Sequence, residues 1–188
     1  MDDLTNHERL DLVEPTAGMK DEFLAMAAEY MSCGNVMELS MYAPAIADFE
    51  GYLERLADHA AGRNLPAGVV RYRMYWLVRG CGAIVATSAL RLESTPHVEQ
   101  ELGHIGYGVR PSQRRRGYGK VICRLTLAKA RLLGMDRVLI TCDSDNVASV
   151  RIIEANGGVM ENQVVSGLTG KLKNRYWVWT GTIYGHQI

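Results

Sequence analysis

Arg114-Arg-Arg-Gly-Tyr-Gly119 is the stretch of sequence that decides the fold. It follows residues 103–110, Gly-His-Ile-Gly-Tyr-Gly-Val-Arg, which combine strand-forming residues with glycines that leave room beside the backbone. From position 121 onward apolar residues recur at helical spacing until Gly134, where a helix would end. The sequence therefore predicts a strand, a glycine-containing turn and a helix in direct succession.

Such a turn predicts an anion site, most naturally for phosphate. Unpaired backbone N–H groups and the positive end of a helix dipole meet there, and three Arg side chains surround it. The turn is not a Walker phosphate loop, because Lys120 is followed by Val121 rather than by Ser or Thr. It is not a dinucleotide fingerprint either, because Ile122 stands where the third glycine would be.

The turn resembles the acetyl-CoA-binding motif of the GNAT superfamily of N-acetyltransferases, Q/R-x-x-G-x-G/A. Residues 137–142 then read as a strand, and residues 145–157 resemble the superfamily's N-x-x-S/A-x-x-hydrophobic-x-E-x-x-G helix. The fixed positions of the two motifs are occupied by Arg114, Gly117, Gly119, Asn146, Ser149, Glu154 and Gly157. The turn alone is a weak signal, but the ordered series is strong. Further phrases, at 103–107 and 138–143, resemble a branch of predicted acetyltransferases with unknown acceptors.

The resemblance implies an α+β or α/β fold with one GNAT-like domain over residues 1–188 and its acetyl-CoA-binding core at 103–158. The expected sheet is mixed and mostly antiparallel, has about six to seven strands and helices on both faces, and is splayed at the acetyl-CoA site. A chain of 188 residues is also most simply one domain. A homodimer is left open.

Composition limits the classes of function. The 21 basic and 21 acidic side chains balance, which argues against general nucleic-acid binding, so the basic cluster at 110–116 is interpreted as a local site. The four cysteines are scattered, which argues against a disulfide framework or a zinc site and favours a reducing cytoplasm. No targeting segment and no apolar run of about 18 residues is present. We therefore expect a cytoplasmic protein without metal, nucleic-acid or membrane partners.

Two helices are expected in the first third of the chain. Residues 9–14 predict a short strand before them. The first helix follows Thr16 and carries an apolar stripe of Met19, Phe23, Met26 and Tyr30, which we interpret as core packing. The second is predicted to begin at Pro44 and to end at Gly62. The resemblance places both helices on the acceptor side of the cleft. The residues that select the acceptor are therefore expected in the least patterned part of the sequence.

Two hairpins are expected as well. Residues 69–79 and 83–92 predict an antiparallel pair in which Tyr72, Met74 and Trp76 share one face. Residues 159–165 and 176–182 predict a closing hairpin at the edge of the sheet. The polar loop at 94–100 leads into the central strand.

The resemblance assigns the cofactor site. Backbone N–H groups from Arg115 to Lys120 would hold the pyrophosphate, Arg114 and Arg116 would add charge, and the backbone near Tyr107 and Val109 would bind the pantetheine. The alternative to a pyrophosphate site is a basic turn that is simply exposed to solvent. The expected acetyl-CoA-binding residues are Val109, Arg110, Arg114, Arg115, Arg116, Gly117, Tyr118, Gly119, Lys120, Asn146 and Ser149.

The groups that would move protons are less clear. GNAT enzymes often place a Tyr acid directly before the Glu of the second motif, but this position is Ile153. Tyr107 ranks first as the substitute acid, followed by Cys142, Ser149 or water, although a Tyr in a strand is more often a packed side chain. A water guided by Glu99 or Glu101 could serve as base.

His104 is the remaining candidate base, because an unperturbed imidazole has a pKa of about 6.5. Alternation along a strand sends His104 and Tyr107 to opposite faces unless a bulge intervenes. A structural His104 is therefore favoured over a catalytic one. An amine held near a thioester also gains most of its rate from positioning, without a specific base.

Three functions remain open. The leading one is an N-acetyltransferase that transfers an acetyl group from acetyl-CoA to an amine of a small molecule or peptide by direct attack on the thioester. The second is a non-catalytic acetyl-CoA-binding or sensing module of the same fold, which the missing Tyr makes conceivable. The third is a nucleotide- or phosphate-binding protein of another fold.

Overall fold

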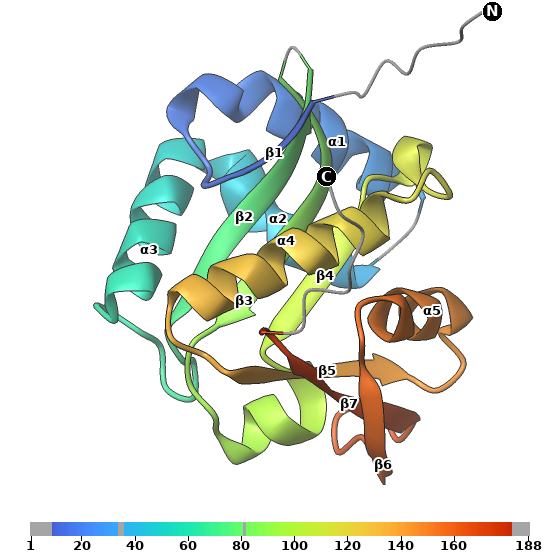
Figure 1. Cartoon of the computed structure of the whole chain (residues 1–188). Coiled ribbons are helices and arrows are strands. Elements are labelled where there is room, and N and C mark those ends of the chain that lie inside the picture. The colour runs from blue at the N-terminus through green and yellow to red at the C-terminus, as the bar shows by residue number, and fades with distance from the viewer. Residues whose placement is uncertain (1–8, 34–35, 81, 182–188) are drawn as a thin grey trace, which may run out of the picture.

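A computed structural model describes residues 9–33, 36–80 and 82–181 (Figure 1). Seven strands form two antiparallel sheets: β1 (Leu10–Val13), β2 (Tyr72–Arg79), β3 (Ala83–Arg91) and β4 (Ile105–Val109) in one, and β5 (Arg137–Asp143), β6 (Val159–Val165) and β7 (Leu172–Trp179) in the other. The α-helices are α1 (Lys20–Ser32), α2 (Val36–Ala47), α3 (Phe49–Ala61), α4 (Tyr118–Leu132) and α5 (Val147–Ala155). Short helical turns occur at η1 (Ala17–Met19), η2 (Val98–Leu102) and η3 (Pro111–Gln113).

The N-terminal sheet has the strand order β1-β2-β3-β4 and is covered on both faces. Phe23 of α1 stacks on Trp76 of β2 with ring centroids 5.2 Å apart, in a core that α2 and α3 complete. On the opposite face Ile122 of α4 packs against Leu77 and Val85. Figure 1 shows α4 crossing in front of these strands. The predicted stripe of the first helix and the shared face of Tyr72, Met74 and Trp76 are both confirmed.

The C-terminal sheet has the order β5-β7-β6, so β6 is an edge strand. The two sheets meet where β4 begins: the His104 N–H donates to the Leu139 carbonyl at 2.6 Å. Gly103 permits this approach, because a Cβ there would lie 2.9 Å from both the Leu139 oxygen and the Thr141 nitrogen. Beyond this contact β4 and β5 share no strand pairing, so the sheets separate toward α4 and α5.

Two predicted boundaries are wrong. Pro44 does not begin a helix, because α2 runs from Val36 to Ala47 with Pro44 inside it. The next helix begins after Asp48, whose side chain accepts a hydrogen bond from the Gly51 N–H at 2.9 Å, and it ends as expected at Gly62. The last strand begins at Leu172 rather than at Tyr176, so the closing turn is shorter than predicted.

No helix in the described ranges is long and apolar enough to cross a membrane.

Candidate active site

The N-terminus of α4 is open to an anion. Gly117 precedes the helix with a φ of 86°, and no side chain among the described residues caps the first turn, which contains no acidic residue. Arg115 also has a positive φ, 61°. The N–H groups of Tyr118 and Gly119 therefore lack intrahelical partners at the positive end of the helix dipole, whereas the Lys120 N–H donates to the Gly117 carbonyl at 3.0 Å.

This helix end opens into a cleft of about 650 Å³ between β4, α4 and α5. All of the predicted acetyl-CoA-binding residues except Arg110 and Arg116 line the cleft. The lining residues are Tyr107, Gly108, Val109, Arg114, Arg115, Gly117, Tyr118, Gly119, Lys120, Asn146, Ala148, Ser149, Arg151 and Ile152. The two sequence motifs, which lie on different helices, thus form opposite walls of one cleft.

Gly119 lets α4 begin directly against these neighbours. A Cβ at this position would lie 2.5 Å from Ile152 Cδ1 and 3.6 Å from Val109 Cγ2. The motif glycines therefore have different roles: Gly117 supplies the left-handed turn, whereas Gly119 supplies space for packing.

Arg110 and Arg116 do not line this cleft. The Arg110 guanidinium ion-pairs with Glu29 at 2.6 Å and with Glu22 at 2.9 Å, and also donates to the Ile84 carbonyl at 3.2 Å. These bonds fix β4 to α1 and neutralise the charge, so the predicted cofactor role of Arg110 is withdrawn. Arg116 is exposed and outside the cleft lining.

The edge of β4 that does not pair with β3 presents the N–H and C=O groups of alternate residues to the cleft. The Arg110 N–H donates to Val85 and the Arg91 N–H donates to His104, which places even-numbered positions of β4 in hydrogen-bonded pairs with β3. Because antiparallel strands alternate, Tyr107 and Val109 direct their N–H and C=O groups to the opposite edge. This orientation supports the expected backbone contacts of these two residues.

The Tyr107 side chain spans the gap between β4 and α5. Its hydroxyl lies 2.9 Å from Ser149 Oγ, and Ser149 is itself placed by a hydrogen bond from its N–H to Asn146 Oδ1 at 3.0 Å. Burial raises the pKa of Tyr107, partly offset by the Ser149 hydrogen bond, so the phenol stays protonated at neutral pH. The cleft therefore contains a protonated, oriented hydroxyl.

Cys142 lies behind this pair and is buried. Burial raises the pKa of its thiol, with a hydrogen bond to Ser149 acting in the opposite direction. It is not among the cleft-lining residues, so its predicted catalytic role is not supported.

His104 is a structural residue in this fold. Its Nδ1 accepts the Leu139 N–H at 3.0 Å, so the proton of the neutral ring is on Nε2, 3.3 Å from Ser94 Oγ. Burial lowers the pKa of His104, and the ring is outside the cleft lining. This geometry favours a structural role for His104 over the role of a catalytic base.

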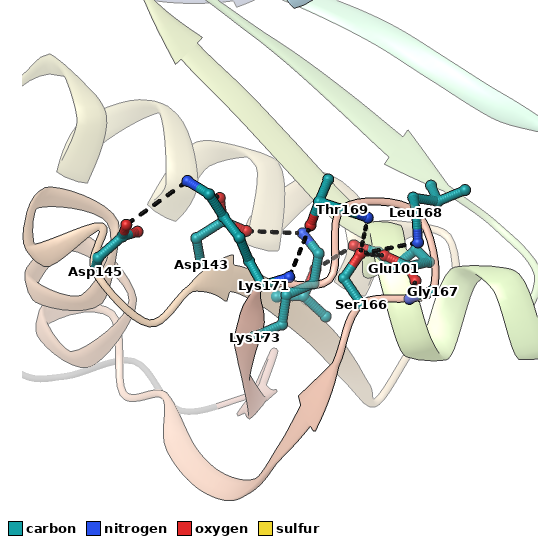
Figure 2. Close-up of polar contacts among 10 residues, drawn as sticks. Glu101, Asp143, Asp145, Ser166, Gly167, Leu168, Thr169, Lys171 and Lys173 are labelled. Atoms are coloured by element: carbon teal, nitrogen blue, oxygen red, sulfur yellow. Dashed lines mark hydrogen bonds and ion pairs between the residues drawn. The ribbon is translucent and has the colours of Figure 1, made fainter.

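Glu101 and Glu99 are engaged elsewhere. Figure 2 shows Glu101 bound to the turn between β6 and β7, where its carboxylate accepts from Ser166 Oγ at 2.7 Å and from the Gly167 N–H at 2.6 Å. We call this set of contacts the Glu101 clamp. Glu99 accepts from Ser94 Oγ at 2.8 Å. Neither carboxylate lines the cleft, so neither is placed to guide a water there.

Sequence reasoning missed one cation of the cleft, Arg151 of α5. It is the one basic residue in the segment 145–157, two positions after Ser149. That signal could have identified it as a second source of positive charge opposite the α4 turn.

The fold is shared with solved acetyltransferases. The microcin C7 self-immunity acetyltransferase MccE, in complex with acetyl-CoA and AMP, is 16% identical over 93% of each chain with a TM-score of 0.67. The ribosomal-protein-S5-alanine acetyltransferase from Vibrio fischeri is 16% identical over 94% of this chain and 95% of that one (TM-score 0.63). RimL, a ribosomal L7/L12 α-N-protein acetyltransferase in complex with CoA, is 16% identical over 90% and 93% (TM-score 0.66).

Among curated proteins no significant match is found. The model of the acetyltransferase (GNAT) domain, however, matches residues 9–159, which include both motifs and the whole cleft. The chain therefore belongs to the GNAT family of acyl-CoA-dependent N-acetyltransferases, which use acetyl-CoA as cosubstrate.

Proposed function

We propose that this protein transfers the acetyl group of acetyl-CoA directly to an amine of a small molecule or peptide. The observation that carries the proposal is the single cleft that joins the uncapped N-terminus of α4 to the hydroxyl of Tyr107. An anion-binding end and a proton donor at the two ends of one cleft are what a phosphorylated thioester cosubstrate requires.

At the anion end, the N–H groups that follow Gly117 bind the pyrophosphate. Arg115, Lys120 and Arg151 add positive charge from the cleft walls. Arg114 also lines the cleft. Its Nε donates to the Val109 carbonyl at 3.3 Å, which fixes the turn to β4.

At the reactive end, the cosubstrate supplies a thioester, whose C–S bond breaks as the amine forms the new C–N bond. The N–H of Tyr107 or Val109 on the free edge of β4 polarises the carbonyl. The Tyr107 hydroxyl gives its proton to the departing sulfur, and the adjacent Ser149 hydroxyl keeps the phenol oriented. The amine loses its proton to water.

The class of acceptor is a proposal of its own. Solved neighbours include a ribosomal-protein-S5-alanine acetyltransferase and spermidine N-acetyltransferase chimeras, so the fold accommodates peptide and small-molecule amines alike. We propose an amine of one of these two kinds, encountered in the cytoplasm, where the free thiols of Cys33, Cys123 and Cys142 would remain reduced.

The test is release of free CoA thiol with a panel of amino acids, polyamines, aminoglycosides and N-terminal peptides. Acetyl-CoA should also raise the melting temperature, corresponding to about 2.7 kcal/mol at a hundredfold excess over its Kd. Gly117→Asp should abolish this shift, because it places a carboxylate at the phosphate site. Gly134→Asp is the matched control, because Gly134 also has a positive φ, 79°, but lies beyond the other end of α4.

The outcomes separate an enzyme from a sensing module, because the match to the GNAT domain model already excludes a nucleotide-binding protein of another fold. Binding of acetyl-CoA without thiol release on any amine would favour a sensing module over an enzyme. An unaltered thermal shift in folded Gly117→Asp would place the phosphate site elsewhere.

A further inference from the structure

A second cavity, of about 340 Å³, lies on the face of the N-terminal sheet that α1–α3 cover. It is bounded by α3, the loop before β2, the strands β2 and β3, and η2. We call it the acceptor cavity, and its lining residues are Tyr52, His59, Gly68, Val69, Val70, Tyr72, Met74, Ala89, Arg91, His97, Val98 and Leu102. Its volume is at the lower end of the range for small-molecule sites, about 300–1,000 Å³.

The walls of the acceptor cavity are mostly apolar, and Arg91 is its one permanently charged residue. None of the lining residues is Asp or Glu. Burial lowers the pKa of His59, so this ring is neutral at pH 7, and its Nδ1 lies 3.0 Å from the Tyr72 hydroxyl. The cavity therefore combines an apolar body with one guanidinium.

The Arg91 guanidinium has no carboxylate partner among the residues that the structure describes. Its Nη1 donates to the Gly103 carbonyl at 3.2 Å. The carboxylates close to it in sequence are bound elsewhere: Glu93 pairs with Arg71, and Glu99 accepts from Ser94. The side chain is half-buried, and a cation partly withdrawn from water without a counter-ion favours an anion supplied by a ligand.

The acceptor cavity lies close to the cleft between β4, α4 and α5, which we call the cofactor cleft. The two approach each other across β4. Ala89, which lines the acceptor cavity, pairs with Gly106. Gly106 faces the same side as Arg91, because a Cβ there would lie 3.5 Å from Arg91 Nη1. The next two residues of the strand, Tyr107 and Gly108, line the cofactor cleft. With glycine at position 106, no side chain of β4 separates the Arg91 end of one cavity from the Tyr107 end of the other.

We propose that the acceptor cavity binds the amine substrate and that Arg91 binds a carboxylate of that substrate, which makes the enzyme an acetyltransferase for small amino carboxylates with an apolar body. The inference rests on the proposed acetyl transfer and specifies its substrate class. One guanidinium balances one carboxylate, whereas a phosphate dianion would leave a buried negative charge without a partner. The apolar walls then contact the remainder of the substrate, and the amine reaches β4 beside Gly106.

The first experiment compares acceptors that differ only in the anionic group. Phenylalanine, phenylalaninamide and phenylethylamine form one series, and leucine, leucinamide and isopentylamine form another. Thiol release is measured with saturating acetyl-CoA, and acceptor binding is measured separately by calorimetry with CoA present. Aminoethyl phosphate and β-alanine form a phosphate-against-carboxylate pair. We expect the carboxylates to have kcat/KM values about 10- to 100-fold above those of their amides.

The second experiment removes the guanidinium. Arg91→Gln should raise the KM of a carboxylate acceptor about 10- to 100-fold, while the KM of the matching neutral amine and the Kd of acetyl-CoA change less than about threefold. Arg91→Lys should recover part of the loss. Arg71→Gln is the control, because Arg71 pairs with Glu93 at the surface and does not line the cavity. Far-UV circular dichroism verifies the fold of each variant.

Each result has one interpretation. Equal kcat/KM for carboxylates and amides, in an enzyme that acetylates both, would overturn the carboxylate assignment and leave the proposed acetyl transfer intact. A preference for aminoethyl phosphate over β-alanine would overturn it too. Calorimetric binding of a carboxylate that is lost in Arg91→Gln would support the assignment even if no amine were acetylated, a case that would overturn only the proposed activity. Unchanged binding in both Arg91 variants would place the anion elsewhere.

Discussion

Tyr107→Phe distinguishes two roles of Tyr107, that of a general acid and that of a ring which only packs in the core. The change removes one hydroxyl, whose hydrogen bond to Ser149 Oγ measures 2.9 Å, and leaves the ring in its place in the core. Loss of one such bond costs about 1 kcal/mol of stability. In a chain of this length that lowers the melting temperature by about 2–4 °C.

The expected effect on rate is much larger. A lost general acid lowers kcat by roughly 10²- to 10⁴-fold. Burial raises the pKa of Tyr107, which makes the phenol a weaker acid than tyrosine in water, so we expect a loss near the lower end of that range. The same shift keeps Tyr107 protonated throughout the neutral range, so the wild-type rate should show no decline from its ionisation between about pH 6 and pH 9.

The assay is thiol release with saturating acetyl-CoA and one acceptor, together with a melting curve of each variant. Tyr75→Phe is the control. Tyr75 pairs with Ser88, which in turn pairs with Tyr107, so the two tyrosines lie on the same face of the sheet. Tyr75 is buried and does not line the cleft. A Tyr107→Phe rate within about threefold of wild type would refute the assignment, since an acid should cost at least a hundredfold. Proton donation would then come from Ser149 or from water.

Three further predictions concern glycines and the Glu101 clamp. Gly106→Val should lower turnover at least about tenfold with little change in acetyl-CoA affinity, because it places a branched side chain beside Arg91 where the cavities meet; an unchanged rate would show that the acceptor approaches elsewhere. Gly119→Ala should cost about 0.5–1.5 kcal/mol, since its Cβ would lie 2.5 Å from Ile152 Cδ1 and this flexible side chain must leave its rotamer; chemical denaturation measures this, and a loss above about 3 kcal/mol would mean that the backbone of α4 shifts instead. Glu101→Gln should cost about 2 kcal/mol at pH 7. The hydrogen bond from Ser166, acting against burial, lowers the pKa of Glu101, so its contribution is present above the unfolded pKa and is lost as pH falls through the folded value; a stability difference that grows as the pH falls below the unfolded pKa would contradict this account.

Local signals predicted the half of the molecule that forms the proposed cosubstrate site. Periodicity located α4, the family resemblance located β5, and its motif positions include Asn146, whose side chain caps α5 in the structure. Most residues of the cleft walls could therefore be predicted from sequence, because each lies in a segment that its own motif identifies, whereas Arg151 lies outside the fixed motif positions.

Roles that depend on distant partners could not be predicted. Arg110 belongs to the same basic run as Arg114, but carboxylates about eighty positions earlier neutralise it. Arg91 reads as one more basic residue in a strand, and only the folded sheet shows that it lacks a carboxylate among the described residues. The Pro44 boundary failed for a different reason: Pro44 lies inside α2 although proline usually breaks a helix interior, and the stronger start signal was the cap at Asp48.

The Glu101 clamp also affects how the protein folds. It joins residues 65 positions apart, and it connects η2, which carries Val98 and Leu102 of the acceptor cavity, to the turn between β6 and β7. Contacts between positions so distant in sequence form late, because the intervening chain must first be closed into a loop. We therefore expect the η2 wall of the acceptor cavity to be among the last parts to be completed. Its amides should exchange with solvent deuterium earlier than those of β2 and β3, since opening the C-terminal hairpin releases η2 without melting the N-terminal sheet.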